Sequence, residues 1–367
     1  MKFILNTVGG PATRAAIVAA VVVLALPGAP APAAGRQATE PEAPPVERAE
    51  LVMGTMARIG LPPAQASPRA FEAAFAALRD VDATMSLYRR DSELVRVNAR
   101  AGEHPEPVDA ALFALLARAR ELGLESNGAF DVTVLPLLRL WGAYPELTYL
   151  GAGSVTAVGI EGLRLDPRAH SVSFARPGMG IDLGGIAKGF ALDRARAALA
   201  AAGVDRARLD LGGDLAFIGD GPQGAWRAAV RDPDAPDRPL GVLAVGADAS
   251  FSTSGNYERD FAHEGWRAPS HIYDPRSGRP VTRDLAVTVW SPDATTADAL
   301  STALIVLGPE GADALLAREP TAGALFAERL PGETTRRITL AGRAPLGWTP
   351  NPSRAPSPSV TDQGDRS

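Results

Sequence analysis

Residues 51–348 form a long stretch that no internal repeat and no Pro-rich linker interrupts, and this feature most limits the folds open to the chain. The composition changes on either side of it. Residues 35–50 are rich in Pro and Glu, and residues 349–367 contain almost no apolar side chains. Such segments cannot bury enough apolar surface to fold, so we expect both to be disordered. The stretch between them predicts one compact domain rather than two separable ones.

Strand-like alternation and helical spacing follow one another in mixed order within this stretch. We expect helices over 67–86, 108–126, 186–204 and 291–308. We expect strands over 51–61, 170–185, 206–220, 239–255 and 284–293. The strand over 206–220 would carry two glycines in its middle. With 46% apolar residues to fill a core, the pattern predicts an α+β fold with mixed sheets and packed helices.

Residues 1–34 have the pattern of a signal peptide. Lys2 and Arg14 precede an apolar run from Ala15 to Leu26, which is short for a membrane span, and residues 31–33 offer an A-x-A cleavage site. The pattern predicts export to the periplasm of a bacterium. The alternative is an uncleaved membrane anchor.

The chain contains no cysteine, which excludes disulfides, thiolate catalysis, cysteine metal sites and a lipid anchor on cysteine. Its net charge of −5 and the lack of dense Lys and Arg runs argue against nucleic acid as a partner.

Four glycine-containing turns with polar residues stand out, at 53–55, 182–189, 210–214 and 252–255. In the second, "DLGGIAKG", a strand is expected to end and a helix to begin with a lysine in its first turn. The amides of such a helix start could bind an anion such as phosphate. Taken alone, the turn is more simply a plain connection, because glycines at strand ends are usually turns and the spacing is that of neither a P-loop nor a Rossmann fingerprint.

Asp298 and Thr302 lie one turn apart in the helix expected over 291–308, so their side chains share a face. Two hard oxygen ligands on one face suit Mg²⁺, which takes few protein groups and completes its shell with phosphates and water. The alternative is structural: a threonine bonded to its own helix and an aspartate near the polar helix start.

His271 stands beside Asp274 and Arg276 in "SHIYDPRSGRPV". It could be a general base or a ligand, with Arg276 as a phosphate partner, or a packed or capping residue.

Eight segments taken in order carry a resemblance. They are "MGTMARI", "MSLYRRDSELVRVNA", "GAFDVTVLPLLRLWG", "GIDLGGIAKGFALDRA", "LDLGGDLAFIG", "STSGNYER", "HIYDPRSGRPV" and "VTVWSPDATTADALSTALIVLG". Together the chain resembles the ApbE family of FAD:protein FMN transferases over residues 53–308. The resemblance implies a single ApbE-like, T-fold-related domain.

The resemblance also implies an activity: the FMN half of FAD passes to a Ser or Thr hydroxyl of an exported or membrane redox protein, and AMP leaves. Mg²⁺ would be held by Asp298, Thr302 and the backbone carbonyl of Gly185. His271 would be the base for the acceptor hydroxyl. Contacts to FAD are expected from Met53, Tyr88, Ala129, Phe130, Asp131, Asp182, Lys188 and Ile272. Tyr88 would lie against the flavin ring, at an otherwise polar strand edge.

Asp210 departs from the family, whose members often have Asn there. Two other functions stay open. An FAD pyrophosphatase would use water in place of the acceptor hydroxyl, and a non-catalytic FAD-binding protein would need no metal, although both Asp298 and Thr302 are present. The oxygen ligands would also accept Mn²⁺ or Ca²⁺.

Overall fold

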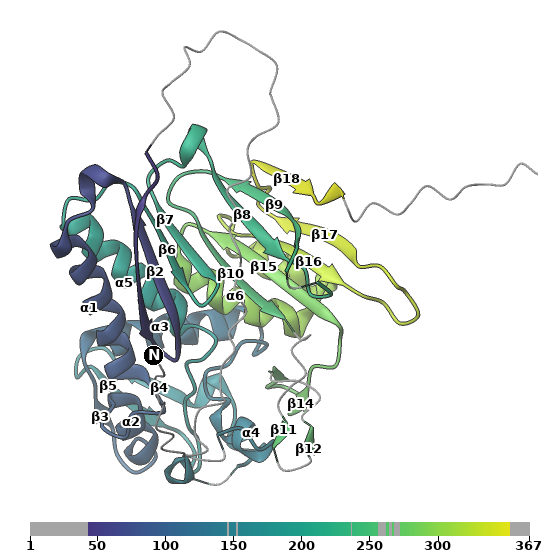
Figure 1. Ribbon diagram of the computed structural model, residues 1–367. Coiled ribbons are helices and arrows are strands. Elements are labelled where there is room, and N and C mark those ends of the chain that lie inside the picture. Colours follow the sequence, from purple (N-terminus) through teal and green to yellow (C-terminus); the bar gives the residue numbers. More distant parts are fainter. Residues whose placement is uncertain are drawn as a thin grey trace, which may run out of the picture.

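The computed structural model describes residues 43–144, 147–151, 153–235, 237–255, 262–263, 266–267 and 272–352. Its centre is an eight-stranded sheet in which every pair of neighbours is antiparallel. In order across the sheet the strands are β1 (Val46–Val52), β2 (Thr55–Leu61), β6 (Ala207–Leu211), β7 (Asp214–Ile218), β10 (Ser250–Gly255), β15 (Leu285–Ser291), β16 (Gly323–Glu328) and β17 (Arg337–Gly342). Figure 1 shows this sheet running through the molecule.

Helices cover one face of the sheet. They include α1 (Pro68–Met85), α5 (Ala187–Ala201) and α6 (Ala294–Leu307), with α5 packed between the other two. On the opposite face lies a second sheet of β8 (Trp226–Arg231), β9 (Pro239–Val245) and β18 (Gly347–Pro350). The remaining helices are α2 (Glu93–Arg100), α3 (Ala110–Glu125), α4 (Leu135–Leu140) and α7 (Ala312–Leu316). The remaining strands are β3 (Glu106–Pro107), β4 (Leu163–Asp166), β5 (Ser171–Phe174), β11 (Ala262–His263), β12 (Trp266–Arg267), β13 (Tyr273–Asp274) and β14 (Arg279–Pro280). Short 3-10 helices span Pro63–Gln65, Thr148–Leu150, Ile160–Gly162, Pro222–Gly224 and Pro309–Gly311.

The middle of the central sheet is buried on both faces, whereas the edge strands β1 and β17 are largely exposed. Side chains alternate between the two faces along each strand. In β15, Val287 and Val289 belong to the large core under the helices, whereas Ala286 and Trp290 belong to a second apolar cluster against β8 and β9. Packed helices and sheets in one compact body confirm the predicted α+β class, but the strand pairs of the described sheets are antiparallel rather than mixed as predicted.

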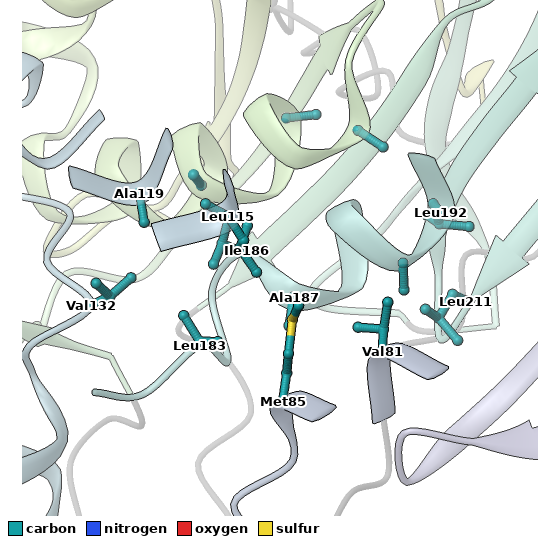
Figure 2. Packing of buried hydrophobic residues seen from close by; sticks show 14 of the residues in the cluster. Val81, Met85, Leu115, Ala119, Val132, Leu183, Ile186, Ala187, Leu192 and Leu211 are labelled. Atoms are coloured by element: carbon teal, nitrogen blue, oxygen red, sulfur yellow. The ribbon is translucent and has the colours of Figure 1, made fainter. Parts of the chain in front are cut away.

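Helix starts follow local capping chemistry. Ser67 accepts a hydrogen bond from the Ala70 amide at the start of α1, Asp109 accepts one from the Leu112 amide at α3, and Asp293 accepts one from the Thr296 amide at α6. All four predicted helices are confirmed. Inside the core, Met85 of α1 points at Ala187 in the first turn of α5, while Leu183 and Ile186 face Leu115 of α3 (Figure 2). These contacts fix the start of α5.

Two expected strands are hairpins instead. Residues 51–61 turn at Met53 and Gly54, and residues 206–220 turn at Gly212 and Gly213. Both of the latter glycines have positive φ, 61° and 96°, which a two-residue hairpin turn requires and which glycine adopts without strain. Alternating side chains look the same in one long strand and in two paired ones, so the sequence pattern missed the reversal.

The expected strand over 170–185 is also shorter than predicted. Regular pairing stops at Phe174, and beyond it an isolated bridge joins Gly180 to Val134. The segment that leads into α5 is therefore irregular, and "DLGGIAKG" does not follow a strand.

Among the described residues, regular structure begins at Val46 and ends at Pro350, somewhat outside the predicted limits of 51 and 348. Residues 46–50 form strand because they pair with β2. The expected signal peptide and most of the expected tail lie outside the described residues. Within the described part, no single helix is long and apolar enough to cross a membrane; the bent pair Ala294–Leu307 and Pro309–Leu316, at 114°, meets the composition only together.

Candidate active site

The starts of α5 and α6 cross at close range, and Gly189 makes the crossing possible. A Cβ at Gly189 would lie 2.1 Å from the Ala294 carbonyl oxygen and 2.9 Å from the Asp298 Cβ. Asp193 of α5 locks the crossing, because its carboxylate accepts hydrogen bonds from the Ala294 amide (3.1 Å) and the Thr295 amide (2.8 Å) at the start of α6. The first turn of α5 and the second turn of α6 are thereby brought together.

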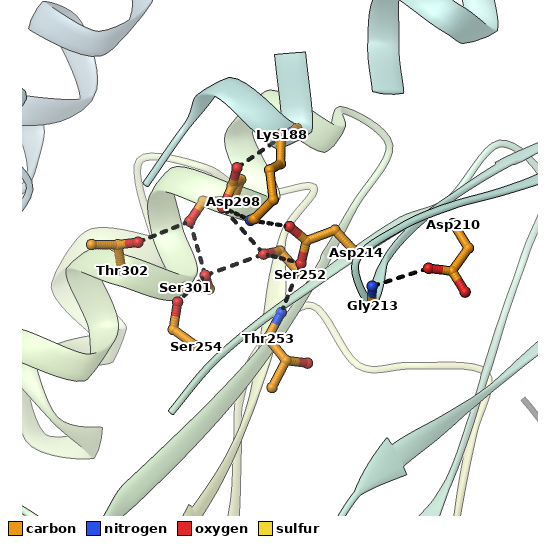
Figure 3. Close-up of polar contacts among 11 residues, drawn as sticks. Lys188, Asp210, Gly213, Asp214, Ser252, Thr253, Ser254, Asp298, Ser301 and Thr302 are labelled. Atoms are coloured by element: carbon orange, nitrogen blue, oxygen red, sulfur yellow. Dashed lines mark hydrogen bonds and ion pairs between the residues drawn. The ribbon is translucent and has the colours of Figure 1, made fainter. Parts of the chain in front are cut away.

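A polar cluster, here called the ammonium cluster, fills this crossing. It consists of Lys188, Asp214, Ser252, Asp298 and Ser301 (Figure 3). The Lys188 ammonium forms ion pairs with Asp214 and, at 3.3 Å, with Asp298 Oδ1. Ser252 Oγ donates to Asp214 Oδ1 at 2.8 Å. Four different elements, β7, β10, α5 and α6, therefore meet at one ammonium group.

The charges of this cluster are withdrawn from water. Asp298 is 2% exposed and Asp214 is 4% exposed, while the Lys188 side chain keeps 28% exposure. Burial raises the pKa of Asp298, although the Lys188 charge and the Gly189 amide work against that rise. Burial alone would lower the pKa of Lys188, but the two carboxylates outweigh it and raise the pKa, so the ammonium keeps its proton at neutral pH.

Thr302 and Gly185 lie beside each other at the edge of this cluster. A Cβ at Gly185 would be 2.9 Å from Thr302 Oγ1, so the Gly185 backbone passes directly by the hydroxyl. Thr302 Oγ1 donates to the Asp298 carbonyl at 3.4 Å, which leaves its lone pairs free. One carboxylate, one hydroxyl and a neighbouring backbone segment are hard oxygen donors of the kind that Mg²⁺ takes. The residues present thus fit the predicted metal.

This donor set holds only one carboxylate. Within the described ranges, no three His, Cys, Asp or Glu side chains gather into a group that could hold a metal ion. Any cation bound here would therefore need further ligands from substrate or water, as Mg²⁺ commonly does.

Asp182 fixes the turn that carries Gly185. Its Oδ1 accepts from the Gly184 amide at 2.7 Å, its Oδ2 accepts from the Tyr144 hydroxyl at 2.6 Å, and its own amide donates to the Val132 carbonyl at 2.8 Å. Burial raises the pKa of Asp182 against these hydrogen bonds. The hydrogen bond from the Asp182 amide to the Val132 carbonyl also brings the predicted segment Ala129 to Asp131 next to this turn.

Asp131 is 6% exposed and accepts hydrogen bonds from the Thr133 amide (2.7 Å) and the Thr133 hydroxyl (2.6 Å). Burial raises the pKa of Asp131 to about 6, although both bonds lower it. Ala129 and Phe130 are buried beside it, where the Phe130 amide donates to Ser126 Oγ. These three residues are therefore buried and tied into the fold by hydrogen bonds.

Tyr88 does not lie at a strand edge, as the sequence suggested, but in a turn after α1. Its side chain is 56% exposed, and its ring meets the edge of Tyr144 at 5.8 Å. Tyr144 also donates a hydrogen bond to Asp182, which holds the turn that carries Gly185. Tyr88 therefore contacts this turn indirectly, through Tyr144. Aromatic rings can stack on planar ligands, and this side chain is more than half exposed.

Three further predicted residues lie elsewhere along the chain. Met53 occupies the β1–β2 turn with a positive φ of 52° and packs partly against the core. Ile272 is buried, and its carbonyl accepts from the Val281 amide at 2.9 Å beside the β13–β14 hairpin. His271, the predicted base, lies outside the described residues.

The sequence interpretation gave no role to Asp214, Ser252, Ser301 or Tyr144. The motifs "DLGGD" and "STSG" had marked the first two as members of polar turns. Their meeting depends on β7 and β10 being neighbours in the sheet, where Phe251 pairs with Leu215. Asp210, the departure from the family, accepts a hydrogen bond from the Gly213 amide at 3.0 Å and so holds the hairpin turn before Asp214.

Comparison with known proteins agrees with this architecture. The model of the ApbE family matches residues 53–326. A FAD:protein FMN transferase of Treponema pallidum (strain Nichols) is 36% identical over 303 residues, which is 76% of this chain and 83% of that relative. The chain therefore belongs to the ApbE family.

Solved structures place it in the same class of enzyme. The flavinyl transferase ApbE of Pseudomonas stutzeri, in its apo form, has a TM-score of 0.67 and 31% identity, covering 81% of this chain and 94% of that one. The flavin transferase ApbE of Vibrio cholerae has a TM-score of 0.67 and 27% identity, covering 81% and 97%. The protein is accordingly a flavin transferase by fold, by sequence and by relatives.

Proposed function

We propose that this chain transfers the FMN half of FAD to a Ser or Thr hydroxyl of another protein, with Mg²⁺ as its metal and AMP as the leaving product. The meeting of Lys188, Asp298, Thr302 and Gly185 at the crossing of α5 and α6 carries this proposal. These residues place a cation, a carboxylate, a hydroxyl and backbone groups at one edge of the core. Such groups can bind a diphosphate and its metal.

In the proposed reaction the acceptor oxygen attacks the phosphorus of the FMN half. A new phosphorus–oxygen bond forms, the bond from that phosphorus to the bridging oxygen breaks, and AMP leaves with the bridging oxygen. The hydroxyl proton passes to a base, for which His271 is the candidate. Asp298, Thr302 and the Gly185 carbonyl would hold Mg²⁺, which when bound would offset charge on the diphosphate.

The remaining predicted residues would hold the rest of FAD. Tyr88 is proposed to lie against the flavin ring, because its side chain is exposed and contacts Tyr144, which donates a hydrogen bond to Asp182. Met53, Ala129 to Asp131, Asp182 and Ile272 are proposed to line the site around it. A polar diphosphate end and an aromatic flavin end would then lie on either side of Tyr144.

The acceptor is proposed to be an exported or membrane redox protein with a Ser/Thr-containing modification motif, and the enzyme to act in the periplasm. The N-terminal signal peptide pattern supports this location, because an exported enzyme meets exported acceptors. The chain after cleavage would begin close before β1, and the proposed domain, predicted over 51–348, would also include residues 46–50 of β1.

The test is to incubate the purified protein with FAD, Mg²⁺ and a candidate flavin-acceptor domain, and to weigh the acceptor by intact mass. We expect a mass gain equal to FMN, its loss when Mg²⁺ is removed by a chelator, and its loss in Asp298→Ala. The matched control is Asp313→Ala, which removes an exposed carboxylate from α7 and should leave the transfer unchanged.

Other outcomes would select other functions. Metal-dependent release of FMN and AMP without any gain in acceptor mass would identify a pyrophosphatase, in which water replaces the hydroxyl. FAD binding with neither product, across several acceptor domains, would identify a non-catalytic flavin-binding protein and refute the proposal.

A further inference from the structure

Lys188 is the only lysine in the sequence apart from Lys2, whereas arginine occurs throughout. The two cations are not equivalent: an ammonium is a compact point charge, and a guanidinium is a broad planar fork. The one lysine of the folded part lies between two buried carboxylates, Asp214 and Asp298. This position therefore calls for a small cation.

In each carboxylate, one oxygen accepts a hydrogen bond from a neutral donor and the other contacts the Lys188 ammonium. Asp298 Oδ2 accepts from the Gly189 amide at 2.9 Å, and Asp214 Oδ1 accepts from Ser252 at 2.8 Å. The other oxygen of each carboxylate faces the ammonium. For Asp298 this is Oδ1, the oxygen that the protein's neutral donors hold least, since Ser252 Oγ lies 3.4 Å away. A metal bound by Asp298 needs the oxygen that the ammonium already contacts.

We propose that Lys188 is an internal counter-cation that occupies Asp298 when no divalent cation is bound and competes with that cation for the same carboxylate oxygen. The inference rests on the proposed function, because Asp298 is taken as a metal ligand only there. One ammonium between two carboxylates leaves the cluster with a single negative charge. A divalent ion added to it brings two cations onto one carboxylate, and they repel each other.

The consequence concerns the order of binding. Free protein should hold a divalent cation weakly, because the ammonium must move away from Asp298 first. A diphosphate adds negative charge that both cations can share, so metal and FAD should strengthen each other's binding. The cluster would thus favour loading of the metal together with its substrate.

The opposite role for Lys188 makes an opposite prediction. If the ammonium served only to orient Asp298 toward the metal, its removal would weaken metal binding, because the carboxylate would lose its support. If it competes, its removal should strengthen metal binding. The sign of the change in metal affinity separates the two.

The experiment measures Mn²⁺ binding to the purified protein without FAD, by the electron paramagnetic resonance signal of the free ion. Wild type, Lys188→Gln, Lys188→Arg and Asp298→Asn are compared. We expect Lys188→Gln to bind Mn²⁺ about tenfold more tightly than wild type, a coupling of ordinary size. Lys188→Arg keeps the positive charge and should not gain affinity. Asp298→Asn should lose binding, which locates the ion.

An unchanged or weaker affinity of Lys188→Gln would overturn the proposal, as would an equal gain in Lys188→Arg. Absence of Mn²⁺ binding to Lys188→Gln would overturn it too. FMN transfer to an acceptor, measured separately on wild type, would still report on the proposed function, so the two failures can be told apart.

A second measurement needs no variant, in case Lys188→Gln does not fold. Wild-type protein is treated with an amine-reactive N-hydroxysuccinimide ester, and acylation of Lys188 is followed by peptide mass mapping with and without Mn²⁺. Release of the ammonium from Asp298 should raise the acylation rate several-fold when Mn²⁺ is added without FAD. A rate that Mn²⁺ lowers or leaves unchanged would contradict displacement.

Discussion

At the scale of single residues, the burial of Asp131 makes the stability of the folded protein depend on pH. Its carboxyl keeps a pKa of about 6 in the folded protein, above the ordinary value of 3.8, because burial outweighs the bonds from Thr133. The folded state therefore binds this proton more tightly than the unfolded state does. The stability gained from it is fully present below the ordinary pKa and is lost as the pH rises through about 6.

Asp131→Asn should remove this pH dependence. The amide oxygen can still accept from Thr133, but it carries no charge to bury. Between about pH 4.5 and about pH 7.5, wild type should lose about 2 kcal/mol more of its free energy of unfolding than the variant does. Denaturant titrations of both proteins at the two pH values measure this difference. An identical pH response in the two proteins would show that Asp131 titrates normally.

The sequence reveals some site residues for a simple reason. Asp298 and Thr302 are neighbours on a helix face, so their spacing in the sequence is enough to pair them. Lys188 is likewise marked by its place in a first helical turn. Asp214 and Ser252 are not visible in this way, because they meet across a strand pair whose register only the folded sheet defines. Tyr144 gave no signal either, since its partner Asp182 is distant in sequence.

At the scale of elements, the crossing of α5 over α6 determines the site. Glycine is a poor residue for the interior of a helix, yet Gly189 lies in the first turn of α5, where no other side chain has room. Asp193, one turn further on, holds the start of α6 by its amides. The distance between Lys188 and Asp298 is thus set by helix packing before any ligand arrives.

Gly189→Ala tests this packing. Helix propensity alone would make the variant more stable by about 1 kcal/mol. The contact with the Ala294 carbonyl at 2.1 Å predicts the reverse, a loss of about 1 to 3 kcal/mol in the free energy of unfolding, as is typical of overpacking. Gly102→Ala is the control, because nothing lies within 4 Å of its added methyl group. Denaturant unfolding compares them, and a stabilised Gly189→Ala would refute the close crossing.

At this scale, the sequence pattern did not predict where a strand reverses into a hairpin. The glycines of 210–214 were recognised as special, but their positive φ values convert one expected strand into two. The four longest described helices were predicted because capping residues and apolar spacing are both local, whereas the short helices α2, α4 and α7 were not. Strand reversal also depends on which partner the second half finds, which no local pattern states.

At the scale of the whole molecule, the central sheet separates two apolar clusters, of which the larger lies next to the candidate site. The larger one lies under α1, α5 and α6 and supports the site, whereas the second lies between the sheet and β8 and β9. The fold class followed from the mixed order of segments, but this two-sided burial did not, because β8 and β9 resemble any other alternating strands.

Leu243→Ala should destabilise the protein without altering the site. Leu243 is fully buried in the second cluster, so truncation should cost about 2 to 5 kcal/mol in the free energy of unfolding. FMN transfer measured well below the melting temperature should remain at the wild-type level. A large loss of transfer by fully folded Leu243→Ala would mean that the two regions are mechanically coupled.

The order of strands across the sheet has a consequence for how the molecule folds. β1 and β2, β6 and β7, and β16 and β17 are hairpins of neighbours in sequence, which close quickly. β2 ends at Leu61 but its other neighbour β6 begins at Ala207, and β10 must find both β7 and β15. Closing such long loops is slow. Because Lys188, Asp214, Ser252 and Asp298 come from elements that only those late pairings unite, we expect a refolding chain to recover its hairpins first and its capacity to bind metal last.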